Sequence, residues 1–222
     1  MTENEFLTPD PIQIPEPLVS TERKVIYRRP TFESEIEVTV DLEERREIMS
    51  DSELHFLSHM LEHISMRGCI NIEVKIGLPR YKLTHVVCED LGITLGYALL
   101  HLFSNNISNG INTFGEGSGV LDEALSRVVI SVEGRPGLFI DNHLGRELEE
   151  LVEDMQAHDL IAFLEGFSQG FKTTLHIDIL KGRNPHHIWE SVFRALGEAL
   201  RGVFAPCEWR KGLIAAIKRT LY

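Results

Sequence analysis

The sequence predicts an α+β fold that is internally duplicated, in which each half has a small β-sheet covered on one face by helices. The first observation is a pattern, H-x3-E-x5-L-G-x-A-L, that begins at His85 and again at His186, 101 residues later. The second is that both halves place strand-like and helix-like segments in the order strands, helix, strand, helix. Two copies of one pattern within the same order of elements are typical of an internal duplication.

The composition is that of a soluble globular protein. The 222 residues are 43% hydrophobic and 25% charged, which is ordinary for this class. A formal net charge of -12 disfavours non-specific binding to nucleic acid or to an anionic membrane surface. No apolar run of membrane-spanning length and no signal peptide is apparent, so we expect a cytoplasmic protein. The three cysteines, Cys69, Cys88 and Cys207, are expected to be reduced thiols.

The first half is predicted to span about residues 25–120, after an N-terminal arm over 1–24. The arm is rich in proline and acidic side chains, so we expect it to be extended or disordered. Hydrophobic periodicity sets the elements that follow, and Gly68 is expected to end the first helix. In order, these are a strand over 25–40, a solvated loop or short helix over 41–52, a helix over 53–67, a strand over 70–77, and a helix carrying His85 and Glu89 to about Phe103.

The second half is predicted to span about residues 121–222 and to repeat this order. It is preceded by a turn-rich loop over 104–119, whose glycines lack the sequence of a phosphate-binding loop. Pro185 suits the first position of a helix, where no backbone donor is lost. The predicted elements are a strand over 126–132, a long and broken helical stretch over 144–171, a strand over 173–180, and a helix that begins at Pro185.

The repeated histidine and glutamate are the candidate functional residues. His186 and Glu190 are four residues apart, which places both side chains on one face of a helix and lets them reach one point. Such a pair can form a metal site, a hydrogen-bonded pair or a solvated ion pair. His85 and Glu89 have the same spacing, so two related halves could build one shared metal centre.

A row of histidines on the first predicted helix is a second candidate. His55, His59 and His63 recur at every fourth residue and would share one helix face. They could form a row of metal ligands, or some of them could be surface or packing residues.

The short motifs, taken in order and with their spacing, resemble the imidazoleglycerol-phosphate dehydratase family, the manganese-dependent lyases of histidine biosynthesis. The resemblance covers about residues 29–212. The motifs that carry it are Arg29-x-Thr31-x-Glu33-Ser34-x-Ile36, His59-Met60-Leu61, His85-x3-Glu89-Asp90-x-Gly92-Ile93-x-Leu95-Gly96, Leu121-Asp122-Glu123-Ala124-Leu125, Gly134-Arg135-Pro136, Thr174-Leu175-His176-Ile177, and Asn184-x-His186-His187-x2-Glu190-x2-Phe193-Arg194-Ala195. The resemblance implies a duplicated fold, a small phosphorylated substrate, and a homo-oligomer whose subunits share metal ligands.

The resemblance also implies a centre of two manganese ions, from which this sequence departs in two places. The ligand positions that remain are His59, His85, Glu89, His186, His187 and Glu190. Val86 stands where the family has the second histidine of the first motif, and Ala162 stands where it has a histidine in the second half. The cofactor is therefore expected to be a divalent metal, manganese by resemblance, with one or two ions per subunit.

The duplication suggests how the remaining ligands divide between the two ions. One expected set is complete, and it comprises His59, His85, Glu89 and His187. The other set keeps only His186 and Glu190, because its partners at Val86 and Ala162 are absent. His158 lies one helical turn before Ala162 and is a candidate substitute, although a shift of one turn moves a ligand by about 5.4 Å.

Acid–base and phosphate-binding residues follow from the same resemblance. The candidate acid–base groups are Glu33, Asp122 and Glu123, which could otherwise be polar residues at strand edges. The candidate phosphate-binding cations are Arg29, Arg135, Arg194 and Lys211, which could otherwise be solvated surface charges. Arg194 replaces a lysine of the family, and Thr113 stands where an arginine is usual.

Three functions remain open at this point. The first is an imidazoleglycerol-phosphate dehydratase with one of its two metal sites depleted. The second is a divergent lyase that uses one metal on another small phosphorylated substrate. The third is a non-catalytic, oligomeric, metal-binding relative. The retained ligands argue against the third function, and the paired losses at Val86 and Ala162 argue against the first. The first function is nevertheless the leading prediction, because most proteins with this full order of motifs carry out that reaction.

Overall fold

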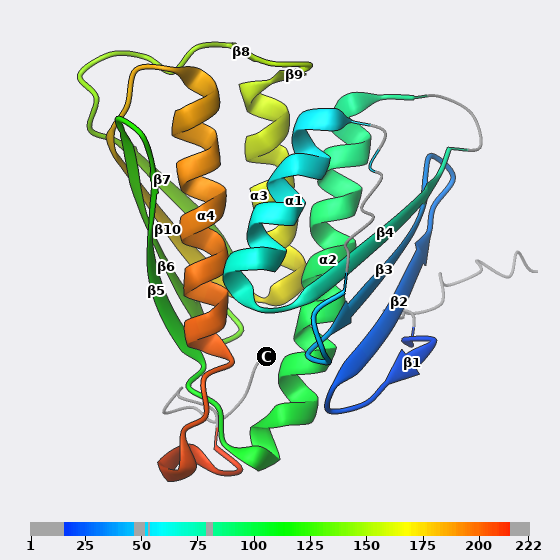
Figure 1. Cartoon of the computed structure of the whole chain (residues 1–222). Helices are drawn as coiled ribbons and strands as arrows, with labels where there is room; N and C mark the ends of the chain where they lie inside the picture. The colour runs from blue at the N-terminus through cyan, green and yellow to red at the C-terminus, as the bar shows by residue number, and fades with distance from the viewer. Residues whose placement is uncertain (1–15, 47–51, 53, 79–81, 214–222) are drawn as a thin grey trace, which may run out of the picture.

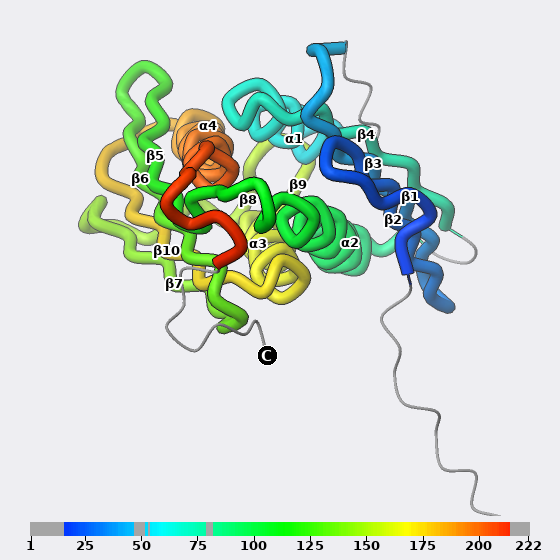
Figure 2. Tube along the Cα trace, turned by 90° about the horizontal axis from the view of Figure 1, so that it is seen from below, coloured from blue at the N-terminus to red at the C-terminus, as the bar shows by residue number. Residues whose placement is uncertain are grey.

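The computed structural model describes residues 16–46, 52, 54–78 and 82–213. Within these residues, two four-stranded sheets form the outer layers and four α-helices lie between them (Figure 1). The view along the helices shows the same layers, with the helices grouped between the strands of the two sheets (Figure 2). One face of each sheet is therefore covered by helices, which confirms the predicted α+β class with two similar halves.

The first sheet has the strand order β1-β2-β3-β4, and all of its neighbouring strands are antiparallel. Its inward side chains, such as Tyr27 and Val38, are fully buried, because alternate residues of a strand face the helices. The strands are β1 (Val19–Ser20), β2 (Lys24–Pro30), β3 (Glu35–Asp41) and β4 (Asn71–Gly77), and the helices of this half are α1 (His55–Gly68) and α2 (Thr84–Asn106).

The second sheet has the order β5-β6-β10-β7, in which only β10 and β7 run parallel to each other. Its strands are β5 (Phe114–Leu121), β6 (Ala124–Val132), β7 (Gly137–Asn142) and β10 (Thr173–Lys181), and its helices are α3 (Ala157–Phe171) and α4 (Pro185–Val203). A short hairpin of β8 (Leu151–Val152) and β9 (Met155–Gln156) precedes α3. The division of the chain near residue 120 stays a prediction, and β5 spans that point.

Helix α4 lies directly on strand β5, where every second residue is glycine. A Cβ atom added to Gly115, Gly117 or Gly119 would lie under 3.0 Å from the backbone of α4. Only glycine lets the two backbones approach so closely. The segment 104–119, predicted to be a turn-rich loop, therefore contains most of a strand, and the prediction was wrong there.

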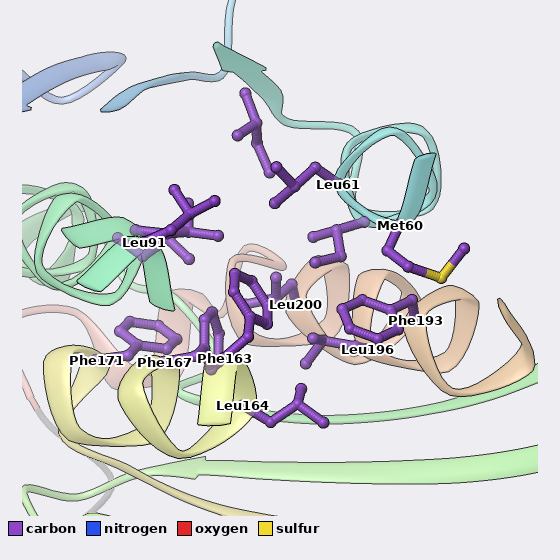
Figure 3. Packing of buried hydrophobic residues seen from close by; sticks show 14 of the residues in the cluster. Met60, Leu61, Leu91, Phe163, Leu164, Phe167, Phe171, Phe193, Leu196 and Leu200 are labelled. Atoms are coloured by element: carbon purple, nitrogen blue, oxygen red, sulfur yellow. The ribbon is translucent and has the colours of Figure 1, made fainter. Parts of the chain in front are cut away.

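The helices pair across the two halves, α1 with α4 and α2 with α3. The two helices of each pair run parallel to each other. The two pairs also point the same way, and the N-terminal ends of all four helices lie at one end of the molecule (Figure 1). Side chains from the four helices fill the space between the pairs (Figure 3), among them Leu61, Leu91, Phe163 and Phe193, all fully buried. Each such side chain contributes about 1.5–3 kcal/mol by leaving water.

Several predicted elements match the structure and others do not. The helices predicted over 53–67 and from His85, and the strands over 70–77 and 173–180, are confirmed as α1, α2, β4 and β10. The strand predicted over 25–40 is a hairpin of two strands, β2 and β3, and β7 was not predicted. Residues 1–15 of the predicted arm and 47–51 of the predicted charged loop lie outside the described residues.

The helical stretch predicted over 144–171 was wrong for its first half, since the helix begins only at Ala157. Gly145 has a φ of 68° and Glu153 a φ of 51°, both in the left-handed region that interrupts a right-handed helix. The run of acidic residues before Leu151 imitated a helix in composition without supplying an apolar stripe.

Helix α2 corrects one further expectation. By length and composition the segment Thr84–Asn109 is long and apolar enough to cross a membrane, whereas no such run was expected from the sequence. Most of this segment is buried inside the protein, as the core helix of a two-layered helix arrangement should be.

The three cysteines are free, and burial raises the pKa of the Cys88 thiol.

Candidate metal centre

The first turn of α4 sets the direction of the candidate ligands. The Asn184 side chain accepts a hydrogen bond from the backbone N–H of His186 at 2.9 Å, and Pro185 occupies the first helical position. With this start, His186 and Glu190 face α1, and the side chain of Glu190 is only 5% exposed. A buried carboxylate needs partners to offset its desolvation.

Replacing Asn184 by alanine is expected to cost about 1 kcal/mol of folding stability, because the first turn of α4 loses its cap. Chemical denaturation of the two proteins measures the difference. Asn184→Asp is the matched control, since aspartate accepts the same bond, and it should keep most of the stability. If both variants lose the same folding stability, the hydrogen bond accepted by the side chain of residue 184 does not contribute to stability.

Four side chains converge on the carboxylate of Glu190. His59 Nε2 lies 3.0 Å and His186 Nε2 3.1 Å from Glu190 Oε2, while His63 Nε2 lies 3.0 Å from Oε1. Arg194 forms an ion pair with Oε1 from the next turn of α4. Helix α1 thus contributes two histidines to a cluster that α4 completes, and we call it the α1/α4 cluster.

The α1/α4 cluster has the composition and spacing of a metal site. His59, His63 and Glu190 offer ligand atoms within 4.8 Å of one another. Burial lowers the pKa of His63 to about 4, although Glu190 acts in the opposite direction. Burial alone would raise the pKa of Glu190, but His63, His59 and Arg194 hold it below its usual value. Neutral imidazole and ionised carboxylate are the donors that manganese, iron and zinc accept.

A second cluster lies at the N-terminal ends of α2 and α3, and we call it the α2/α3 cluster. His85 Nδ1 is 3.6 Å and His158 Nε2 is 3.2 Å from Oδ1 of Asp159. These three residues also offer ligand atoms within 4.8 Å of one another. Glu89 is half-buried one turn after His85 on α2, at the position that corresponds to Glu190.

His187 faces away from both clusters and is held by the β5–β6 hairpin. Its Nδ1 lies 2.8 Å from Glu123 Oε2, and Glu123 Oε1 accepts hydrogen bonds from the backbone N–H groups of Arg183 and Asn184. The bonds from Asn184 and His187 lower the pKa of Glu123 to about 2, and Glu123 in turn raises the pKa of His187. Glu123 therefore anchors the start of α4.

The other candidate acid–base residues lie at the tips of two hairpins. Glu33 is exposed in the β2–β3 turn, and Asp122 is exposed in the β5–β6 turn with a φ of 46°. The pairing of β6 with β10 and of β3 with β4 puts both tips at the end where the helices begin. The four helices begin at that end (Figure 1), and the contacts of both clusters include residues of first helical turns, such as His186 and His85.

The four predicted phosphate-binding cations are not brought together within one chain. Arg29 forms an ion pair with the buried carboxylate of Asp90, and Arg194 pairs with Glu190. Arg135 is exposed in the turn before β7, near the C-terminal end of α3, and Lys211 is exposed near the C-terminal end of α2. These last two cations lie at the end of the molecule opposite to the clusters.

The structure groups the candidate ligands differently within one chain from the predicted sets. His59 lies with His186 and Glu190, whereas His85 lies with residues of α3. The ligand roles themselves, including ligands shared with another subunit, stay predictions.

Two residues in or beside the clusters, Asp159 and Glu153, were not predicted from the sequence. Glu153 Oε1 lies 2.8 Å from His186 Nδ1. His63 was predicted only as one member of a histidine row that could bind metal. The four-residue spacing of that row was the signal for His63. His158 was considered only as a substitute, and the structure places it beside His85.

Comparison with known proteins finds matches in one family. Residues 52–200 match the family model described as imidazoleglycerol-phosphate dehydratase. Proteins of that name from Methylococcus capsulatus and Pseudomonas paraeruginosa are 36% and 38% identical to this chain over 199 and 200 residues. Each match covers 90% of this chain, and it covers 98% and 99% of the respective relative.

Solved structures show the same fold. The dehydratase of Pyrococcus furiosus aligns with a TM-score of 0.71 and 27% identity, over 87% of this chain and 99% of its own. The enzyme of Staphylococcus aureus aligns with a TM-score of 0.70 and 24% identity, over 82% and 99%. Since the family model spans most of the chain and the relatives exceed 30% identity over nearly their whole length, this chain belongs to the imidazoleglycerol-phosphate dehydratase family.

Proposed function

We propose that this chain removes water from imidazoleglycerol phosphate in histidine biosynthesis, as a metal-dependent hydro-lyase of the cytoplasm. Membership of the family supports the reaction. The observation that carries the metal dependence is the convergence of His59, His186 and Glu190, from two halves of the chain, in the α1/α4 cluster.

The reaction places a clear demand on the site. Dehydration breaks a C–H bond on one carbon and a C–O bond on its neighbour, and the electron pair of the C–H bond forms a double bond between the two carbons. A base takes the proton, and an acid gives a proton to the hydroxyl group, which leaves as water. The proton is not acidic by itself, so its removal requires stabilisation of negative charge that develops on the substrate. A divalent cation, manganese by family, would supply that stabilisation when bound at the imidazole end of the substrate.

Residues of this chain have separate tasks in the proposal. His59, His63, His186 and Glu190 hold the cation, and Arg194 keeps the Glu190 carboxylate ionised and oriented. Glu33 and Asp122 are exposed at the same end of the molecule and are the candidate acid and base. Glu123 has a low pKa and bonds to His187 and the α4 start, so its task is to position α4.

The substrate site is proposed to lie between subunits of a homo-oligomer. Arg135 and Lys211 are exposed at the C-terminal ends of helices whose N-terminal ends carry the clusters. Because α3 has 15 residues and α2 has 23, the two ends of these helices are about 22 Å and about 34 Å apart, too far for one small substrate to contact both. Arg29 and Arg194 pair with buried carboxylates, which leaves Arg135 and Lys211 of another subunit as the first candidates for the phosphate.

Rescue of a bacterial strain that lacks its own imidazoleglycerol-phosphate dehydratase tests the reaction. The chain is expected to restore growth without histidine, and the purified protein should convert the substrate with added Mn²⁺ and lose that activity after treatment with a chelator. Asn184→Asp serves as a folded control that should still rescue. No rescue by a soluble, metal-loaded protein would exclude the proposed reaction.

The absent histidines at Val86 and Ala162 favour a second candidate. It is a lyase that uses one metal on another small phosphorylated substrate. In that case the auxotroph is not rescued, but the protein turns over a different phosphorylated alcohol when loaded with metal. Metal binding without any turnover would instead indicate a non-catalytic relative.

A further inference from the structure

A buried carboxylate in the α2/α3 cluster is not satisfied by the protein itself. The side chain of Asp159 is 5% exposed, and its Oδ1 atom accepts no hydrogen bond, although two imidazoles face it. A buried polar atom without a partner costs about 1–3 kcal/mol. Asp159 lies in the first turn of α3, where the helix dipole favours a negative charge. The dipole explains why a carboxylate is tolerated at this position, but it does not explain why two histidines approach the same oxygen.

The duplication shows which ligands this cluster lacks. His59 on α1 and Ala162 on α3 each lie ten residues before a C-cap in the left-handed region, Cys69 and Lys172. Ala162 therefore occupies in the α2/α3 pair the position that His59 occupies in the α1/α4 pair. By the same alignment His158 corresponds to His55, one turn closer to the N-terminal end of the helix.

The substitutes stand on the same helix as the lost ligand. His158 and Asp159 are the second and third residues of α3, and both approach His85, the first histidine of the repeated motif. The side chains of His85 and His158 are more than half exposed and can rotate, whereas Asp159 is fixed by burial. Ligand atoms within 4.8 Å need only a small rotation to reach the roughly 2.1 Å bonds of a divalent metal.

We propose that His85, His158 and Asp159 form a second divalent-metal site, in which two residues at the start of α3 replace the ligand absent at Ala162. Glu89, at the position equivalent to Glu190, is the fourth donor from this chain. Imidazole nitrogen and carboxylate oxygen select first-row ions such as manganese, iron or zinc. The inference rests on the proposed function for the choice of manganese, but not for the existence of the site.

The test counts bound ions and does not depend on turnover. The full chain is stripped with a chelator and titrated with Mn²⁺, and the bound ions are counted by electron paramagnetic resonance and calorimetry. The wild-type protein is expected to bind two ions per chain. His158→Ala and Asp159→Asn should each lower the affinity for one ion at least tenfold and leave the other unchanged.

His55→Ala is the matched control, because His55 is the exposed counterpart of His158 on α1. It should bind two ions as the wild type does. Circular dichroism of each variant verifies that the chain has folded, and Asp159→Asn keeps the shape of the side chain. Two ions in both α3 variants, or one ion in the wild type that neither variant alters, would overturn the inference. If the α3 variants lose one ion but the wild-type protein has no dehydratase activity, only the proposed function is overturned.

Discussion

Replacing Glu190 by alanine is expected to lower dehydratase turnover by at least about 100-fold, because even residues that only support metal ligands contribute 10–100-fold. Glu190 is the common partner of His59, His63, His186 and Arg194. Without its carboxylate, three imidazoles and a guanidinium face one another with no negative charge between them. The cation should leave the α1/α4 cluster, and turnover should fall with it.

The measurement is turnover with saturating Mn²⁺, together with the number of ions bound. Glu190→Gln keeps the size of the side chain and should also lose the ion. Glu198→Gln, two turns further along α4, is the control, since the ion pairs of Glu198 within the described part of the chain are with Arg67 and Arg201. Retention of metal and turnover in Glu190→Gln would show that this carboxylate has only a structural role.

Replacing Gly92 by alanine is expected to destabilise the fold by about 3 kcal/mol, the upper part of the usual range for overpacking. A Cβ atom on Gly92 would lie under 3.0 Å from the backbone of Phe163 and Phe167 on α3. Backbone cannot give way as a flexible side chain can, so α2 and α3 must move apart. That movement also separates His85 from Asp159 and should weaken the proposed second metal site.

Chemical denaturation with and without Mn²⁺ measures both effects. The matched control is Gly68→Ala on α1, where the nearest atom to an added Cβ is the backbone oxygen of Gly197 at 3.5 Å, an ordinary contact. Alanine is the better helix former, so this variant should be neutral or gain up to about 1 kcal/mol. Equal stability of Gly92→Ala and the wild type would contradict the close contact between α2 and α3.

The sequence predicted the duplicated fold and the helices that carry the ligands, because both depend on local periodicity and on a repeated motif. It did not predict β5, where glycines alternate with polar residues and imitate a loop. Those glycines are required by the backbone of α4, which lies far away in the sequence. The helix expected over 144–171 was wrong in its first half because composition alone does not reveal a left-handed residue such as Gly145.

The roles of the candidate site residues stay predictions, and the sequence did not predict how the structure groups them. His59, His186 and Glu190 were chosen from motif spacing, and the structure brings them together. That α1 pairs with α4 follows from packing between the halves, which no pattern within one half encodes. The burial of Asp159, and so its unsatisfied oxygen, depends on the same packing.

The pairing of each helix with one from the other half has an evolutionary consequence. A half-length ancestor could have made the same contacts only as a dimer of two identical copies, with two identical clusters. Any substitution in that ancestor would have changed both clusters at once. In a single chain that holds both copies this restriction is absent, because a substitution changes one cluster and leaves the other as it was. The chain accordingly has His59 at one position and Ala162 at its counterpart.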